Sequence, residues 1–188
     1  MFGFGKKKSL QGVRVAVLAT DGVEQDELAK PWKALEDAGA EVYLISGRTG
    51  RIQAVKSLAQ SNTIPVDATL DEVHPASFAA LFIPGGLASP DRLRQNDKAL
   101  DFVRLFSRRN KPISAIAQGP SVLASAGILS GRTVTSWPGI QDDLRNAGAL
   151  WQDEPVVVDD NLVTGRGPKD LKKFNKRMVE HFAEQVNV

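Results

Sequence analysis

The residues best placed for chemistry in this 188-residue chain form one tetrapeptide, Ala117-Gln118-Gly119-Pro120. The apolar run Ile113–Ile116 before it is typical of a strand, and Ser121–Gly127 after it has the pattern of a helix closed by glycine. A sharp strand-to-helix turn can hold one residue strained and exposed above a sheet, beside helix N-terminal amides, as a nucleophile requires. Here that residue is Ala117, whose methyl group is no nucleophile, and an ordinary strand–loop–helix corner has the same pattern.

Other sources of reactive groups are few. The chain has no cysteine, which excludes disulfides, thiolate metal sites and thiol catalysis together. Its two histidines, His74 and His181, are distant in sequence and lack ligand spacing, so we expect surface or packing roles for them and no metal site. Ser114 and Ser121 lie outside any Gly-x-Ser-x-Gly pattern and are not expected to act as nucleophiles. No feature indicates a cofactor.

Composition favours an ordinary globular protein, with 42% apolar and 24% charged residues. The length suits one α/β domain, which we expect over residues 13–188 after a flexible basic tail over residues 1–12. No apolar run approaches the roughly 20 residues that cross a bilayer. The N-terminus also lacks a secretory signal pattern, so we expect a cytoplasmic protein without a membrane partner.

Basic residues gather near both ends of a chain whose net charge is +2, with Lys6–Lys8 at one end. Near the other end, four lysines fall on one face of a predicted helix over Lys169–Gln185, and apolar residues fall on the opposite face. The two sets are Lys169, Lys172, Lys173 and Lys176, and Leu171, Phe174, Met178 and Phe182. This is the pattern of a solvated amphipathic helix, and no nucleic-acid motif accompanies it, so we expect no nucleic-acid partner.

Strand and helix patterns alternate along the chain, which predicts a mostly parallel sheet covered by helices on both faces. We therefore expect a three-layer α/β/α sandwich with a flavodoxin-like sheet and a C-terminal β-hairpin. The predicted strands are Val13–Ala19, Val42–Ser46, Ala80–Ile83 and Ile113–Ile116. The predicted helices are Asp26–Ala38, Pro90–Arg94, Lys98–Arg109 capped by Asp97, Ile140–Asn146 and Lys169–Gln185. Hairpins are predicted as an irregular insert over Arg51–Pro65 and over Val156–Thr164, turning at Asp160-Asn161.

Three unusual loops should converge at the carboxyl ends of the strands, where open sheets of this kind bind ligands. They are residues 20–27, residues 84–91 and the elbow at Ala117–Pro120. Acidic side chains, a Pro-Gly-Gly turn that presents backbone amides and a sharp elbow are components of an acyl-transfer or carbonyl-addition site.

These residues resemble the PfpI family, the intracellular protease and protein deglycase branch of the class I glutamine-amidotransferase-like superfamily. The most specific matches are Thr20-Asp21-Gly22-Val23-Glu24 with Glu27 and Pro31, Pro84-Gly85-Gly86 with Ser89-Pro90-Asp91, Ser136–Gly148 and Val156–Asp159. In that family the elbow is Ala-Ile-Cys-His-Gly-Pro, with cysteine as nucleophile and histidine as base. The resemblance aligns the cysteine with Ala117 and the histidine with Gln118.

The resemblance also implies roles for the surrounding residues. Glu27 matches the glutamate that hydrogen-bonds the cysteine sulfur, and Asp91 matches an acid that orients the histidine across a subunit boundary in oligomeric members. Gly85 or Gly86, with the amide of Gln118, matches the oxyanion hole. Two positions depart from the family: Val55-Lys56-Ser57 replaces a common Trp-Asn-His, and Gly165 replaces a polar residue. We expect the binding site to comprise Glu24, Glu27, Gly85, Gly86, Asp91, Ala117, Gln118, Gly119, Ser136 and Trp137.

Loss of the nucleophile and base together predicts a non-catalytic pseudoenzyme, because neither a methyl group nor a glutamine amide can replace a thiolate and its base. Such a protein would bind a small carbonyl or carboxylate compound or act as a scaffold, as a homo-oligomer (dimer or hexamer), in a stress response. One alternative is a weak hydrolase or lyase that uses Glu27 and Asp91 with water. Another is inactivation by design. Without its sulfur partner, Glu27 is either a neutral hydrogen-bond donor or a relic acid solvated by water.

Overall fold

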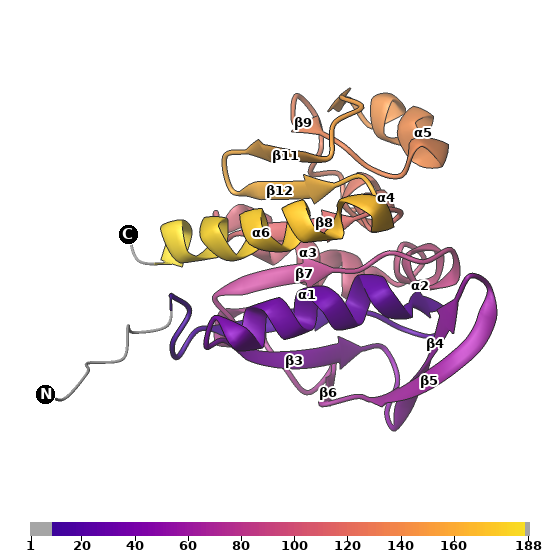
Figure 1. Cartoon of the computed structure of the whole chain (residues 1–188), viewed down its shortest axis with the longest axis vertical. Helices are drawn as coiled ribbons and strands as arrows, with labels where there is room; N and C mark the ends of the chain where they lie inside the picture. Colours follow the sequence, from indigo (N-terminus) through magenta and orange to yellow (C-terminus); the bar gives the residue numbers. More distant parts are fainter. Residues whose placement is uncertain (1–8, 187–188) are drawn as a thin grey trace, which may run out of the picture.

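The computed structural model describes residues 9–186, and its centre is a seven-stranded sheet in the order β11-β12-β8-β7-β1-β3-β6 (Figure 1). All neighbouring strands are parallel except the antiparallel pair β11 and β12. The strands are β1 (Arg14–Leu18), β3 (Glu41–Ser46), β6 (Ala68–Thr69), β7 (Ala80–Ile83), β8 (Ile113–Ile116), β11 (Val156–Asp159) and β12 (Leu162–Gly165). The central order β3-β1-β7-β8-β12 is the flavodoxin-like order predicted from the sequence.

Helices cover both faces of the sheet, which confirms the predicted three layers. Along β1, Val15 and Val17 face one apolar cluster, whereas Ala16 and Leu18 face the other. Helices α1 (Gln25–Asp37) and α6 (Leu171–Val186) pack side by side on the first face, in front of the sheet in Figure 1. The second face is covered by α3 (Asp97–Arg108) and α4 (Pro120–Ser125), with α2 (Ala88–Leu93) and α5 (Gln141–Asn146) beside them.

The amphipathic pattern predicted for the last helix is confirmed. Its four apolar side chains are buried against the sheet, and its four lysines are exposed. The regular helix starts at Leu171, two residues later than predicted, because Pro168–Asp170 forms a short 3₁₀-helix first. No helix in the described part of the chain is long and apolar enough to cross a bilayer.

The insert between β3 and β6 is the hairpin that the sequence predicts. Its strands β4 (Arg51–Lys56) and β5 (Ala59–Pro65) are antiparallel, with a register shift between Gln53 and Val55. Ser57 and Leu58 form its tip with φ of 49° and 75°. A short strand that was not predicted, β2 (Val23–Glu24), pairs with β4 and brings this tip beside the loop that follows β1. The remaining small pair is β9 (Thr133–Val134) with β10 (Leu150–Trp151).

Two local predictions differ from the structure. Helix α3 is capped by Asn96 and not by Asp97: the Asn96 backbone is extended, and its side-chain oxygen accepts from the N–H groups of Lys98 and Ala99. Asp97 is already helical. Near the N-terminus, Leu10 is fully buried and its N–H donates to Ala38 O at 2.9 Å, so packing begins before residue 13. The rest of the predicted tail, residues 1–8, lies outside the described residues.

Candidate functional site

The elbow after β8 has the strained backbone that the sequence predicts. Ala117 is fully buried with φ of 55°, in the left-handed region that L-residues rarely adopt. Its N–H donates to Gly165 O at 3.0 Å, and its carbonyl accepts from the Trp137 N–H at 2.9 Å. The elbow is therefore fixed on both sides, although its central side chain is only a methyl group.

Gly119 and Ser121 complete the turn into α4. A β-carbon on Gly119 would lie 2.6 Å from Ile83 O and 2.9 Å from Ile116 O, so only glycine fits between these strand ends. The Ser121 hydroxyl donates to Gln118 O at 2.7 Å. Ser121 thus closes the turn.

Glu27 lies in the first turn of α1 and turns its carboxyl group toward the elbow. It is 3% exposed, and its Oε2 has no hydrogen-bond partner among the described residues. A β-carbon on Gly85 would overlap Glu27 Oε2 and lie 2.8 Å from Ala117 Cβ, so the carboxyl group sits against Gly85 and next to the alanine methyl. Burial, with the nearby Glu24 and Asp26 carboxylates, raises the pKa of Glu27 to about 8. Glu27 is therefore protonated at neutral pH.

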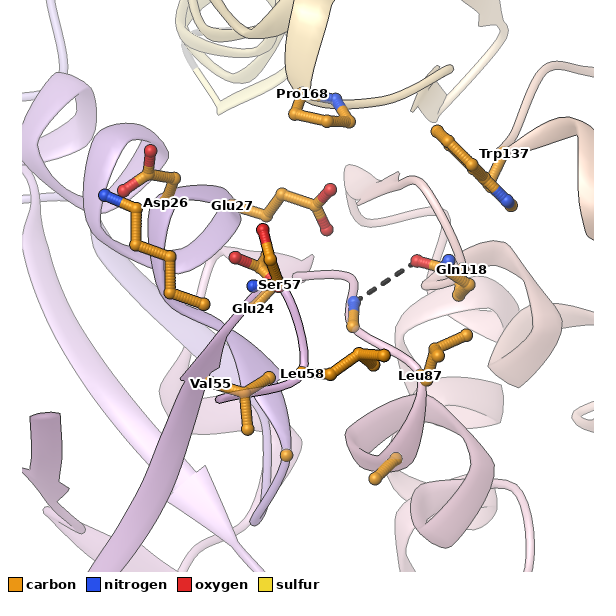
Figure 2. Close-up of a pocket in the computed structure, with 14 residues that line it drawn as sticks. Glu24, Asp26, Glu27, Val55, Ser57, Leu58, Leu87, Gln118, Trp137 and Pro168 are labelled. Carbon is orange, nitrogen blue, oxygen red and sulfur yellow. Dashed lines mark hydrogen bonds between the residues drawn. The ribbon is translucent and has the colours of Figure 1, made fainter. Parts of the chain in front are cut away.

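The Gln118 side chain occupies the backbone amide that the family resemblance assigns to the oxyanion hole. Gln118 Oε1 accepts from the Gly86 N–H at 3.3 Å, the dashed line in Figure 2. Gly86 has φ of 106°, and a β-carbon there would lie 2.5 Å from Gly22 O, so the sharp turn needs glycine. The Gly86 N–H is therefore available in the right place, but its hydrogen bond is already made to the side chain of Gln118.

These groups open into a cleft of about 510 Å³ (Figure 2). Of the ten residues that the sequence predicts for the binding site, five line it: Glu24, Glu27, Gly86, Gln118 and Trp137. Gly85, Ala117 and Gly119 are buried just behind this lining and shape it through the contacts described above.

Asp91 and Ser136, two further predicted residues, do not line the cleft. Asp91 is exposed on α2, where its carboxylate accepts from Gln95 Nε2 at 3.1 Å. Ser136 is fully buried: its hydroxyl accepts from Trp151 Nε1 and donates to Trp137 O, both at 2.9 Å. Ser136 supports the Trp137 loop and does not reach the cleft.

Two leucines that were not predicted, Leu58 and Leu87, form an apolar rim around the cleft together with the predicted Trp137. Leu58, Leu87 and Trp137 are 74%, 59% and 44% exposed, and all three line the opening. Leu58 lies at the tip of the insert hairpin, which reaches the cleft only because β2 pairs with β4. An apolar residue at a hairpin tip is the signal that could have indicated this role. The lining outside the ten predicted residues is Gly22, Asp26, Val55, Lys56, Ser57, Leu58, Leu87, Ala88 and Pro168. Four of these, Gly22, Asp26, Leu87 and Ala88, lie in the loops that were predicted to converge here.

Charged residues at the cleft include three acids, and no metal cluster is formed. Asp26 pairs with Lys30 at 3.0 Å, and the Ser57 N–H donates to Glu24 Oε2 at 3.3 Å. Burial raises the pKa of Glu24 as well. Within residues 9–186, no group of three His, Cys, Asp or Glu side chains is arranged to hold a metal ion.

A flavodoxin-like sheet with an elbow after its fourth central strand, a buried glutamate beside the elbow and a glycine turn opposite define an α/β protein of the nucleophile-elbow class. Residues 13–181 match the model of the DJ-1/PfpI family, and the chain belongs to this family. The chain has no cysteine, and the residue at its elbow is Ala117.

The chain is similar to proteins of archaea and bacteria. The chain is 41% identical to a deglycase of Pyrococcus horikoshii over 168 residues, which cover 89% of this chain and 98% of that protein. It is 42% identical to protein/nucleic acid deglycase 2 of Escherichia coli over 164 residues, 87% and 94% of the two chains. Among solved structures, a ThiJ/PfpI domain protein of Brachyspira murdochii superposes with a TM-score of 0.83 at 25% identity, covering 93% of this chain and 98% of that one.

Proposed function

We propose that this chain is a DJ-1/PfpI protein that binds a small organic molecule in the cleft and carries out no thiol chemistry. The observation that supports the proposal is the state of the elbow. Its backbone is strained at Ala117, but the side chain at this reactive position is a methyl group. The Gln118 side chain also accepts the hydrogen bond of the Gly86 N–H. The cleft is therefore formed, whereas the thiol and the imidazole that the family resemblance places at the elbow are absent.

The similar proteins that are named deglycases suggest the chemistry to test. The family resemblance assigns that chemistry to a thiolate and a histidine base, and this chain has neither at the elbow. In a well-studied serine protease, loss of the nucleophile or the base lowers turnover about a millionfold. We therefore expect no deglycation or peptide hydrolysis above background.

A water-based mechanism with Glu27 and Asp91 receives no support from the geometry. Asp91 lies outside the cleft lining of its own chain, so it would reach this cleft only from a neighbouring subunit. Glu27 is protonated at neutral pH and is a poor base in that state. We propose no second function.

Biological role and assembly extend the same proposal. General stress protein 18 of Bacillus subtilis is 40% identical over 166 residues, which cover 88% of this chain and 95% of that protein, and this similarity motivates a role in stress. The homo-oligomer expected from the family resemblance stays a prediction. Light scattering coupled to size-exclusion chromatography would give the solution mass.

The test compares catalysis with binding in the purified natural protein. We expect flat progress curves on glyoxal adducts and peptides, together with a raised melting temperature for some members of a small-molecule panel. Robust turnover that disappears in Glu27→Gln would overturn the proposal. So would a broad panel without any stabilising compound.

A double variant tests whether the rest of the site can still support the family chemistry once the two missing groups are restored. Ala117→Cys with Gln118→His restores both groups of the family elbow and vacates the Gly86 amide. Return of deglycase activity in the double variant would show that only the reactive groups are missing. Continued silence would point to Val55-Lys56-Ser57 and Gly165, the other positions that depart from the family.

A further inference from the structure

The ionisable side chains that line the cleft are mostly acidic. Its lining includes the carboxyl groups of Glu24, Asp26 and Glu27, and Lys56 is its one basic side chain. Lys56 is exposed at the end of β4. Glu27 is the deepest of the three acids, and its Oε2 is without a partner among the described residues. A ligand that donates hydrogen bonds matches this arrangement.

An anionic ligand has little to bind here. The Gly86 amide, the donor that would hold an oxyanion, is already engaged by Gln118 Oε1 at 3.3 Å. An anion would have to displace that side chain and then lie among three carboxyl groups. The sequence led us to expect a carbonyl or carboxylate ligand, whereas the excess of acidic over basic side chains in the lining favours a cationic one.

We propose that the cleft binds an organic cation, a primary ammonium group on a small aromatic or apolar body, with its N–H groups donated to Glu27. The inference rests on the proposed binding function and names its ligand class. A primary ammonium supplies three donors and no acceptor, so it complements a buried carboxyl oxygen that lacks a partner.

The apolar rim fits the other end of such a ligand. Leu58 comes from the tip of the insert hairpin and Leu87 from the start of α2, close together in Figure 2, and Trp137 adds a half-exposed indole ring. Burying these surfaces is favourable at about 25 cal/mol per Å² of apolar area. The cleft volume of about 510 Å³ admits a ligand with a single aromatic ring.

Binding of a cation is coupled to proton release from Glu27. The titratable groups that line the cleft around it are Glu24, Asp26 and Lys56; the β7–α2 loop, the elbow and the Trp137 loop contribute none to the lining. Glu27 has a pKa of about 8, so it is mostly protonated before binding and ionised in the ion pair. At pH 7 this linkage predicts release of about 0.9 proton per ligand and an affinity about tenfold weaker at pH 6.

Isothermal titration calorimetry with benzylamine tests the inference. Titrations at pH 7 in phosphate and in HEPES, buffers with different ionisation enthalpies and no primary amine, count the protons released. Benzoate and benzamide present the same ring with an anionic and a neutral polar group. We expect binding of benzylamine with release of about one proton, and weaker or absent binding of the other two.

Variants assign the effect to one carboxyl group. Glu27→Gln keeps the size of the side chain and should weaken benzylamine binding at least tenfold and abolish proton release. Glu36→Gln, an exposed position on the same helix, should leave both unchanged. Preferential binding of benzoate or benzamide, or benzylamine binding without proton release, would overturn the cation assignment and leave the binding function standing. Failure of all three probes would overturn the inference, and the broader panel would then decide the proposed function.

Discussion

Replacing the buried Glu27 with glutamine should make the protein's stability much less sensitive to pH. Burial and two neighbouring carboxylates raise the pKa of Glu27 from 4.5 to about 8 in the folded state. The folded state therefore holds this proton more tightly than the unfolded chain does, and the stability linked to it is complete below about pH 4.5 and lost as pH rises toward 8. At about 1.4 kcal/mol per pKa unit, the raised pKa of Glu27 lowers the free energy of unfolding at pH 7 by roughly 3 kcal/mol relative to its value below pH 4.5.

Urea unfolding of the natural protein and Glu27→Gln between pH 5 and pH 9, without ligand, measures this cost. Other titrating groups are shared by the two proteins, so the difference between their unfolding free energies isolates Glu27. That difference should shift in favour of the variant by roughly 2.5 kcal/mol between pH 5 and pH 7 and level off above pH 8. Parallel pH profiles would refute the reasoning, because they would mean that Glu27 ionises in the folded protein as it does in water.

Three further substitutions test the local geometry by urea or thermal unfolding. Ala117→Gly relieves a left-handed φ of 55° and should be neutral or stabilise by up to about 1 kcal/mol; a loss of more than that would mean that the methyl packing outweighs the strain. Gly165→Ser should destabilise by roughly 1–3 kcal/mol, since a β-carbon there would lie 2.5 Å from the Phe174 ring, and an unchanged midpoint would show that the ring moves freely. Asn96→Ala should cost about 1 kcal/mol and Asp97→Ala clearly less; equal costs would contradict the assignment of the cap to Asn96.

The sequence predicted the central sheet well because its signals are local. Strands β7 and β8 have the predicted bounds, since strands buried on both faces are unbroken apolar runs. The elbow was predicted for a similar reason: a strand that ends at Ile116 and a helix that begins at Pro120 leave only a sharp turn between them. The cap of α3 was missed because Asn96 and Asp97 are both good caps, and only the backbone angles decide between them.

The cleft was harder to predict because its features depend on distant pairs. Strand β2 has two residues and exists through its pairing with β4, so nothing local announces that Leu58 reaches the site. The hydrogen bond between Gln118 and Gly86 joins residues 32 positions apart. It engages the backbone N–H of Gly86, which the sequence analysis treated as a free donor. Asp91 was assigned by resemblance alone, as an acid that acts across a subunit boundary; it is exposed on α2, and its role stays a prediction.

The strained elbow by itself says little about function in this chain. Its peptide groups join Ala117 to Gly165 and to Trp137, so the turn holds β8 against β12 and anchors the Trp137 loop whether or not a nucleophile is present. Glu27 is different. Its Oε2 makes no hydrogen bond among the described residues, and its burial opposes folding at neutral pH. A buried acid without a hydrogen-bond partner is the feature that the proposed ligand would satisfy, and for that reason we rest the functional argument on Glu27.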